Sequence, residues 1–420
     1  MVSARDADSP SRGRIARTDS SARLAGEEPA VTVPVTQVDR QSVMDSFGRL
    51  AASQQFAMEY LYARLFVQHP ELRALFPLSM EQTRATTFGM LAKLVSSLHD
   101  PRTTDVLLAQ LGCDHRKFGV KDDHYQPFFD ALLVAVEQVS GPAWTGPVSR
   151  AWRTVLTYFA TSMRSAAAQD AATQPAWWIG EIVQHDLRTP TIAVLTIRPD
   201  RPLTYQPGQY ISVQVAKWPR LWRRYSIANA PRENGLLDIH VRAVPGGMLS
   251  AALVSHTGTG DTLTLASARG DLRVPADVDR DVVCVAGGTG LAPIKAIVEA
   301  IVMQTRQGKR RSVTLYLGAR RDSDLYDMRD LATLRLAYPA LNLVQVVDEE
   351  QGVLPEAVKR HASFRNTEVY VAGPAGMVSA TVRALANRVP SDRFHHDPLD
   401  ALMAASRPAT GLSYQPGQPR

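Results

Sequence analysis

The stretch Gly287-Gly288-Thr289-Gly290 follows a buried apolar run, Val282 to Ala286, and precedes a helical pattern that covers Ile294 to Gln304 after Pro293. The pattern predicts a strand, a glycine turn and a helix. Glycines let a backbone approach a ligand closely, and a helix start offers unpaired N–H groups and the positive end of the helix dipole. The stretch therefore predicts a pyrophosphate site, although a tight structural connection has the same pattern.

A histidine in the N-terminal half has a distinctive setting. The helical segment 43–168 contains four histidines: His69, His99, His115 and His124. His69 and His99 border prolines that indicate loops. His115 lies on a helix that is expected to end at Gly119, and Asp122 or Asp123 can cap the next helix. Most single histidines on helices are ordinary surface residues, so His115 becomes a candidate ligand only if its neighbours agree.

A third stretch, Arg223-Arg224-Tyr225-Ser226, combines residue types that suit a phosphorylated aromatic cofactor. A guanidinium fork pairs with phosphate, an aromatic face stacks on a planar ring, and a short hydroxyl can hydrogen-bond the edge of that ring. An exposed Arg beside a strand Tyr is the alternative interpretation.

The amino-acid composition limits the class of protein and the partners that the chain can have. A chain of 420 residues with 45% hydrophobic and 21% charged residues indicates a multidomain globular protein. No apolar run approaches the roughly 20 residues of a membrane span, which predicts a soluble protein without stable membrane insertion. The net charge of +6 is spread thinly, which argues against nucleic acid as a partner. Two isolated cysteines, Cys113 and Cys284, favour a reducing cytoplasm and argue against disulfides, zinc and iron–sulfur clusters.

Hydrophobic periodicity divides the chain into three domains. We expect an all-α domain, an antiparallel β-barrel and an α/β domain with a parallel sheet. The predicted limits are a disordered leader at 1–38, the helical domain at 39–168, a linker at 169–175, the barrel at 176–276, the α/β domain at 277–400 and a disordered tail at 401–420.

The helical domain resembles the globin domain of flavohaemoglobins. Tyr125 follows His115 by ten residues, and the upstream run from Tyr62 to Phe76 matches the same family. The resemblance implies haem b with His115 as the axial metal ligand. It also implies that Tyr62 points into the distal pocket, that Phe76 packs on the porphyrin and that Tyr125 belongs to the network behind the histidine.

The second half resembles the ferredoxin reductase family, on Arg-x-Tyr-Ser and on two glycine-containing turns in the expected order. The resemblance implies that FAD is bound by Tyr210, Arg223, Arg224, Tyr225, Ser226, Gly247 and Ser250, with Asp397 beside the flavin. It implies that the nicotinamide nucleotide is bound by Gly288, Thr289, Gly290, Leu291, Ala292, Pro293, Gly373 and Pro374.

Three positions depart from the flavohaemoglobin pattern. The usual distal glutamine is replaced by Thr83, with Gln82 one place away. We expect Pro147 where the family has the glutamate of its proximal His-Tyr-Glu network, and Leu399 where it has an aromatic residue that covers the flavin. The network behind the iron is therefore expected to lack its acidic partner.

The resemblance implies a flavohaemoprotein that passes electrons from NAD(P)H through FAD to haem and oxidises nitric oxide to nitrate with O2. Three alternatives stay open: a haem-bearing reductase with a different donor or acceptor, a gas-binding sensor kept reduced by its own reductase domain, and an FAD oxidoreductase with a helical module that binds a partner and no haem. The choice between NADH and NADPH is also open, because Arg320 and Arg321 suit a 2′-phosphate whereas Asp322 and Asp324 repel one.

Overall fold

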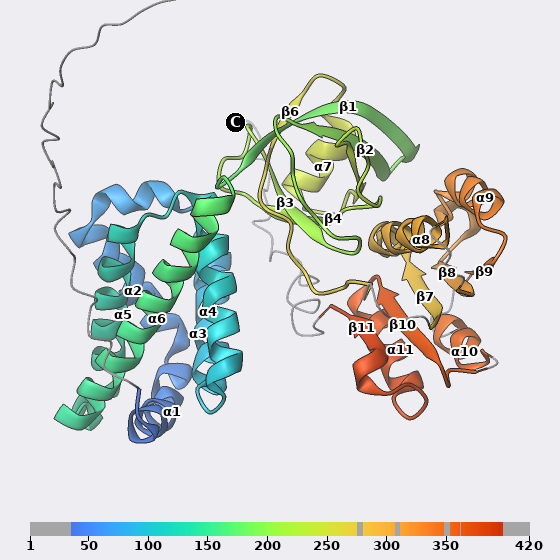
Figure 1. Ribbon diagram of the computed structural model, residues 1–420. Coiled ribbons are helices and arrows are strands. Elements are labelled where there is room, and N and C mark those ends of the chain that lie inside the picture. The colour runs from blue at the N-terminus through green and yellow to red at the C-terminus, as the bar shows by residue number, and fades with distance from the viewer. Residues whose placement is uncertain (1–34, 275–279, 307–310, 348–352, 362, 398–420) are drawn as a thin grey trace, which may run out of the picture.

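The computed structural model describes residues 35–274, 280–306, 311–347, 353–361 and 363–397. Three regions with separate hydrophobic cores follow one another, and the β-barrel lies between the helical domain and the parallel-sheet domain (Figure 1). Most of the predicted leader, the predicted tail and Leu399 lie outside the described residues. This order of domains matches the predicted fold class.

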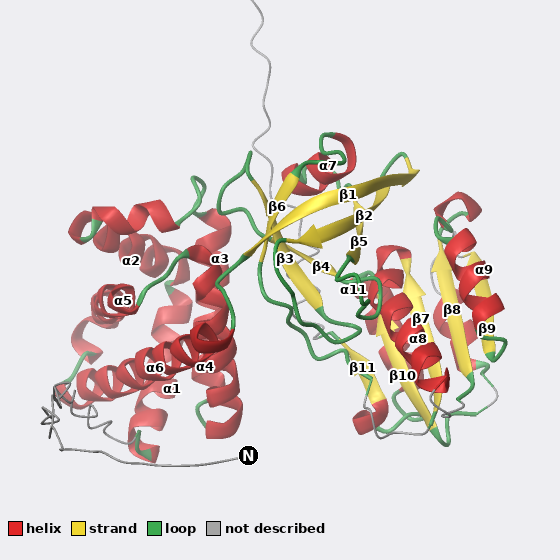
Figure 2. Cartoon of the chain, turned by 45° about the horizontal axis from the view of Figure 1, so that its top comes forward, coloured by secondary structure: helices red, strands yellow, loops and turns green. Residues whose placement is uncertain are grey.

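The N-terminal domain is all helical (Figure 2). Its helices are α1 (Gln37–Ala52), α2 (Gln54–Gln68), α3 (Glu81–Ser97), α4 (Pro101–His115), α5 (Tyr125–Ser140) and α6 (Gly146–Thr173), with 3-10 turns η1 (Pro70–Leu75), η2 (Arg116–Phe118), η3 (Asp122–His124) and η4 (Gly141–Ala143). Their apolar faces meet around Trp152 and Phe159, both fully buried, and the Trp152 Nε1 donates to Ser46 Oγ at 2.8 Å. Helix α6 continues to Thr173, so most of the predicted linker is helical.

The barrel is antiparallel. Its strands are β1 (Trp178–Thr189), β2 (Ile192–Pro199), β3 (Tyr210–Val215), β4 (Arg223–Ser226), β5 (Leu237–Arg242) and β6 (Thr262–Leu265), with helix α7 (Met248–Ser255). They form one sheet in the order β4-β3-β6-β1-β2-β5, and a bridge between Ile227 and Ile239 brings its two edges together. The barrel is therefore nearly closed, which leaves little unpaired edge.

The third domain is a parallel sheet in the order β11-β10-β7-β8-β9. Its elements are β7 (Asp281–Gly287), η5 (Gly288–Gly290), α8 (Leu291–Arg306), β8 (Val313–Ala319), η6 (Asp322–Asp324), α9 (Met328–Ala337), β9 (Leu341–Val347), α10 (Val353–Lys359), β10 (Thr367–Ala372), α11 (Ala375–Leu385), η7 (Ser391–Arg393) and β11 (Phe394–His396). Cys284 of β7 packs with α8 and α9 on one face, whereas Val283 packs with α10 and α11 on the other. Strands covered on both faces explain the unbroken apolar runs of the sequence.

Candidate functional site

His115 is the last residue of α4. Its Nδ1 lies 2.7 Å from the Leu111 carbonyl oxygen, so Nδ1 carries the proton and the Nε2 lone pair is left for a ligand. Burial lowers the pKa of His115 below its usual value, which favours the neutral imidazole that binds iron. The rings of Phe118 and Tyr125 lie 6.3 Å and 6.4 Å from the His115 ring, centroid to centroid. The donor chemistry of this position fits an axial haem ligand.

Tyr62 stands on the α2 face that points into the helical core, where only 4% of its surface is exposed. Its ring meets Phe76 edge-to-face, with the centroids 5.5 Å apart, and Phe66 and Phe128 complete an aromatic cluster. The Tyr62 hydroxyl is 2.6 Å from Thr87 Oγ1. Burial raises the pKa of Tyr62 to about 12, so the phenol stays protonated at neutral pH and can donate to a bound anion.

Helix α5 contacts both the His115 ring and the Tyr62 ring. Its residues Tyr125 and Phe128 are three positions apart and therefore lie on one face, about one turn from each other. Tyr125 contacts the His115 ring and Phe128 contacts the Tyr62 ring. His115 and Tyr62 thus contact neighbouring turns of the same face of α5. A planar group that lies between His115 and Tyr62 would be held against this face.

In the structure the Tyr62 hydroxyl pairs with Thr87, whereas the sequence analysis considered only Thr83 and Gln82 at the position of the family's distal glutamine. Gln82 is exposed, and its Oε1 accepts from Arg223 of the barrel at 3.3 Å. Helices turn about 100° per residue, so Thr87 of α3 faces Tyr62 while Gln82 faces the second domain. No spacing rule in the sequence identifies Thr87.

The expectation for Pro147 is wrong. Pro147 is exposed in the first turn of α6, whereas the far end of α6 packs against α4: a Cβ added at Gly112 would meet the Met163 backbone, and Cys113 Sγ donates to the Ala166 carbonyl. At 1.5 Å per residue, Pro147 is roughly 24 Å from Met163 along the helix. A residue at 147 is therefore too distant to join a network with Tyr125.

The conclusion that Tyr125 lacks an acidic partner nevertheless holds, for a different reason. Helix α6 contains no glutamate, and its one carboxylate, Asp170, pairs with Arg116 and Arg269. Asp122 lies near Tyr125, and its carboxylate accepts from Nε and Nη2 of Arg164. Among the described residues, no hydrogen bond reaches the Tyr125 hydroxyl, and burial raises its pKa to about 12.

The predicted flavin residues gather on β3 and β4. Tyr210 is paired with Ser226, and the Arg224 guanidinium lies 5.0 Å from the centre of the Tyr210 ring. Asp397 joins them, since its charge acts on Tyr210 and the Arg224 charge acts on Asp397. Burial is the largest influence on Asp397 and raises its pKa. An aromatic face, a guanidinium and a hydroxyl within one strand pair fit a flavin.

The two arginines of the motif point in different directions. Arg223, predicted to pair with the FAD phosphate, donates to the Trp222 carbonyl oxygen at 2.9 Å and to Gln82 of the globin-like domain at 3.3 Å. Tyr225 is half-buried beside it, and burial raises the Tyr225 pKa. The structure thus places Arg224, more than Arg223, beside the aromatic face.

The second glycine turn of the barrel comes directly before α7. Ser250 Oγ accepts from the Val244 N–H at 3.2 Å and donates to the Gly247 carbonyl oxygen at 3.2 Å. A Cβ at Gly247 would lie 2.6 Å from Ser250 Oγ and would displace that hydroxyl. The turn therefore presents the N–H groups at the start of α7 beside a serine hydroxyl, as expected for contact with a pyrophosphate.

In the third domain, strand β7 leads through η5 into α8 as the sequence predicts. Gly288 has a φ of +54°, and an added Cβ there would meet only Arg242 Nη1, at 3.6 Å. Gly290 differs, because its Cβ would lie 2.3 Å from the Ala372 carbonyl oxygen and 2.5 Å from Gly373 Cα. The two glycine-bearing turns are therefore packed together at the carboxyl edge of the sheet, where parallel sheets bind nucleotides.

The remaining predicted nucleotide residues lie around this contact. Leu291 and Ala292 are buried in the first turn of α8, and Pro374 caps the start of α11. Thr289 is half-buried within η5, and Pro293 is buried. Arg242, which the sequence did not single out, flanks Gly288 and pairs with Asp324 at 3.3 Å. Glycine backbone with little packed against Gly288, together with a neighbouring guanidinium, fits an anionic dinucleotide.

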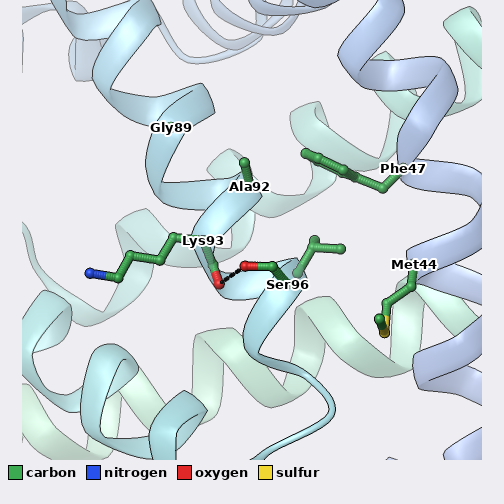
Figure 3. A pocket seen from close by; sticks show the side chains of 7 residues that line it. Met44, Phe47, Gly89, Ala92, Lys93 and Ser96 are labelled. Carbon is green, nitrogen blue, oxygen red and sulfur yellow. Dashed lines mark hydrogen bonds between the residues drawn. The ribbon is translucent and has the colours of Figure 1, made fainter. Parts of the chain in front are cut away.

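A separate surface hollow lies between α1 and α3 (Figure 3). It is lined by Met44, Phe47, Gly89, Ala92, Lys93, Val95 and Ser96. None of the predicted site residues lines it. Over the described part of the chain, no helix is long and apolar enough to cross a membrane, and no group of three His, Cys, Asp or Glu side chains could hold a metal ion. Haem needs only one protein ligand, so His115 does not depend on such a group.

Comparisons with known proteins find one family model for each of the three domains. The globin family model matches residues 59–163, the oxidoreductase FAD-binding domain matches 180–273 and the oxidoreductase NAD-binding domain matches 284–383. The flavohemoprotein of Bordetella pertussis is 26% identical over 372 residues, which is 80% of this chain and 91% of that protein.

Other relatives match the second half alone. The xylene/toluene monooxygenase electron transfer component XylA of Pseudomonas putida is 34% identical over 223 residues, 49% of this chain, and the chain spans 62% of that protein. A crystal structure of flavohemoglobin from Malassezia yamatoensis with bound FAD and heme has a TM-score of 0.73 at 17% identity, covering 86% of this chain and 99% of the other. The chain thus has the domain composition and fold of flavohaemoglobins: it is an oxidoreductase with a haem-binding globin domain, an FAD-binding barrel and an NAD-binding domain.

Proposed function

We propose that this chain is an NAD(P)H-dependent nitric oxide dioxygenase, in which O2 and nitric oxide are the substrates and nitrate is the product. The observation that carries the proposal is the buried Tyr62 hydroxyl, held 2.6 Å from Thr87 Oγ1. The Tyr62 ring meets Phe128, which lies about one turn of α5 from Tyr125, the residue beside His115. A haem group bound at His115 would supply the iron that binds and reduces O2. The name of the Bordetella pertussis relative supports the cofactor set but specifies no reaction.

The protein residues have separate tasks in this proposal. The Leu111 carbonyl fixes the proton on Nδ1 of His115, and this orients the ring and keeps Nε2 available as a ligand. Thr87 can donate its hydroxyl proton to Tyr62 Oη, which leaves the Tyr62 proton for a negatively charged oxygen on the distal side. The aromatic cluster of Tyr62, Phe66, Phe76 and Phe128 excludes water, which strengthens that hydrogen bond.

The reductase domains would supply the electrons. The backbone at Gly288 would bind the nicotinamide nucleotide, while Tyr210, Arg224 and Ser226 would position the flavin that accepts its hydride. Each NAD(P)H delivers two electrons, and each conversion of NO and O2 to nitrate consumes one. We propose both nucleotides as candidates, since Arg320 and Arg321 are exposed just after β8 and Asp322 and Asp324 follow them.

A matched pair of tyrosine variants tests the proposal. Tyr60 stands two residues before Tyr62 on α2, where its ring meets Phe56 and not the Tyr62 cluster. We expect Tyr62→Phe to slow NO consumption at least tenfold under air, and Tyr60→Phe to leave it within twofold. Equal rates in the two variants, with haem content unchanged in both, would refute the role of Tyr62.

A second function is supported by the stronger identity of the reductase half. That half is 34% identical to an electron transfer component, whereas the whole chain is 26% identical to a flavohemoprotein. The chain would then reduce a separate protein acceptor through its flavin. Reduction of such an acceptor at the same rate by His115→Ala would favour this function, because it needs no haem.

The cellular location is proposed from the cysteines. Cys113 and Cys284 are both free thiols, and burial raises the pKa of each. Unpaired thiols suit the reducing cytoplasm. Fractionation of the producing cells, with the haem absorbance as the marker, tests the location.

A further inference from the structure

The three residues that follow His115 all contact elements beyond the globin core. They form η2: Arg116, Lys117 and Phe118. Arg116 pairs with Asp170 near the end of α6 and donates to the Gln174 carbonyl oxygen at 2.7 Å. Lys117 Nζ donates to Ser212 Oγ of the barrel at 3.3 Å, and the Phe118 ring meets the Trp222 ring edge-to-face, with the centroids 6.4 Å apart. The segment that positions the histidine therefore also binds the barrel.

Lys117 occupies an unusual position for an amine, because only 8% of its surface is exposed. Burial lowers its pKa, and the Asp114 carboxylate, 2.6 Å from Nζ, opposes that effect. Nζ also lies 5.1 Å from the centre of the Phe118 ring and 6.0 Å from that of Trp222. A buried charge is tolerated only where partners compensate for the lost water, and here a carboxylate, a hydroxyl and two ring faces do so. Two of these partners, Ser212 and Trp222, belong to the barrel, so the buried charge of Lys117 is fully compensated only when the barrel is docked.

Each barrel residue in this contact is next to a predicted flavin residue. Trp222 directly precedes Arg223, and Ser212 of β3 is paired with Arg224 of β4. On the other side, Phe118 contacts the His115 ring at a centroid distance of 6.3 Å. Rings in contact thus run from the histidine through Phe118 to Trp222, and end at the strand that carries the flavin motif.

We infer that Lys117, Phe118 and Trp222 form an internal docking contact that positions the flavin edge of the barrel against the proximal histidine and so sets the rate of electron transfer from flavin to haem. The inference rests on the haem and FAD sites of the proposed function. In the step that it would govern, the reduced flavin would give one electron to ferric iron, and after two such transfers one hydride from NAD(P)H would restore both electrons to the flavin. The three residues are positioning residues, and none of them exchanges a proton or an electron pair.

Anaerobic stopped-flow mixing of the holoprotein with NADH or NADPH tests the inference, because flavin bleaching and haem reduction are followed at different wavelengths. In Trp222→Ala, we expect flavin bleaching within twofold of the unmodified rate and haem reduction at least tenfold slower. Trp222→Phe keeps a ring at this position and should recover most of the haem reduction rate. Lys117→Met, which removes the charge but keeps the bulk of the side chain, should slow haem reduction as well and serves as a second variant.

Trp218→Ala is the matched control. Trp218 lies in the same β3–β4 connection, but it packs on the barrel core and under Lys217. Its loss should leave the haem reduction rate within twofold. The FAD-to-haem ratio of each variant is measured, and so is the radius of gyration by small-angle X-ray scattering. We expect the radius to increase in Trp222→Ala and Lys117→Met but not in Trp218→Ala, because only the first two loosen the docking of the domains.

The outcomes separate this inference from the proposed function. Equal haem reduction rates in unmodified protein, Trp222→Ala and Lys117→Met would overturn the inference and leave the dioxygenase proposal intact. Fast haem reduction in the unmodified protein without NO consumption would refute the dioxygenase, whereas a tenfold loss in Trp222→Ala would still support the docking contact. If the unmodified protein bleaches its flavin but never reduces its haem, both are refuted.

Discussion

Replacement of Gly290 by alanine should mainly lower stability, whereas replacement of Gly288 should mainly weaken nucleotide binding. At Gly288 the new Cβ meets only Arg242 Nη1, at 3.6 Å, although the φ of +54° costs an alanine about 1 kcal/mol. At Gly290 the Cβ would lie 2.3 Å from the Ala372 carbonyl oxygen, and that neighbour is backbone. Overpacking costs about 1–3 kcal/mol, and a backbone neighbour that cannot rotate away favours the upper part of that range.

These magnitudes translate into distinct measurements. For a domain of this size, the melting temperature falls on the order of 4 °C per kcal/mol, so Gly290→Ala should lose about 8–12 °C and Gly288→Ala about 4 °C. In Gly288→Ala, the new methyl group enters the space where the protein backbone is proposed to contact the nucleotide. We expect the KM for NAD(P)H to rise about tenfold, equivalent to about 1.4 kcal/mol, and Gly288→Val should raise it further.

Calorimetry and NAD(P)H-dependent ferricyanide reduction, which takes electrons from the flavin without the haem, measure the two effects separately. Haem and FAD contents should be normal in Gly288→Ala. An unchanged melting temperature in Gly290→Ala would show that the packing of Gly290 against Ala372 does not limit stability. An unchanged KM in Gly288→Ala, together with a large fall in melting temperature, would show that the turn is structural and not a nucleotide site.

The remaining predictions concern the haem and flavin sites. His115→Ala should lose haem or change the ferrous spectrum, and His124→Ala should do neither; full haem content with an unaltered spectrum in His115→Ala would disprove the axial assignment. Thr87→Val should slow NO consumption less than Tyr62→Phe does, because it removes the partner of the phenol and not the phenol itself. A larger loss than in Tyr62→Phe would contradict a hydrogen-bond chain in which Thr87 donates to Tyr62 and Tyr62 donates to the ligand. Since burial raises the pKa of Tyr62 to about 12, its donor is present below that pH and is lost only above it, so the activity should show no alkaline decline from this group below pH 10; a decline centred near pH 8 that disappears in Tyr62→Phe would contradict the assignment. Arg223→Ala should weaken FAD binding by about 1.5–3 kcal/mol, the range for hydrogen bonds to charged groups, as judged by FAD retention on gel filtration. If only Arg224→Ala releases FAD, Arg224 is the phosphate ligand, as its place beside Tyr210 suggests.

The sequence was most informative where backbone conformation alone determines the residue type. The turn at Gly288 and Gly290 lies where the pattern predicts it, because a positive φ and a close approach to Ala372 both require glycine. The parallel strands were readable because their apolar runs reflect burial on both faces. The end of the helical segment that carries His115 was readable from Gly119, which has a positive φ and follows η2.

Sequence spacing failed where the answer depends on rotation or distance along a helix. Thr87 rather than Thr83 bonds to Tyr62, although the two lie one turn apart on one face of α3, and that choice depends on how far along α3 the helix packs against α2, which no motif encodes. The position of the family's glutamate was assigned to Pro147, at the wrong end of a 28-residue helix, because the sequence does not show which turn of α6 packs against α4. The contact between Phe118 and Trp222 joins residues 104 positions apart in different domains, and only the folded chain brings them together.

The stoichiometry of nitrate formation tests the central claim most directly. Two electrons leave each NAD(P)H, and one electron is needed for each NO that combines with O2 to form nitrate. The account predicts that the purified holoprotein, under air with limiting nicotinamide, consumes two NO and forms two nitrate ions for each NAD(P)H oxidised. Oxidation of NAD(P)H with no loss of NO, or with nitrate well below that ratio while the haem is reduced, would contradict it.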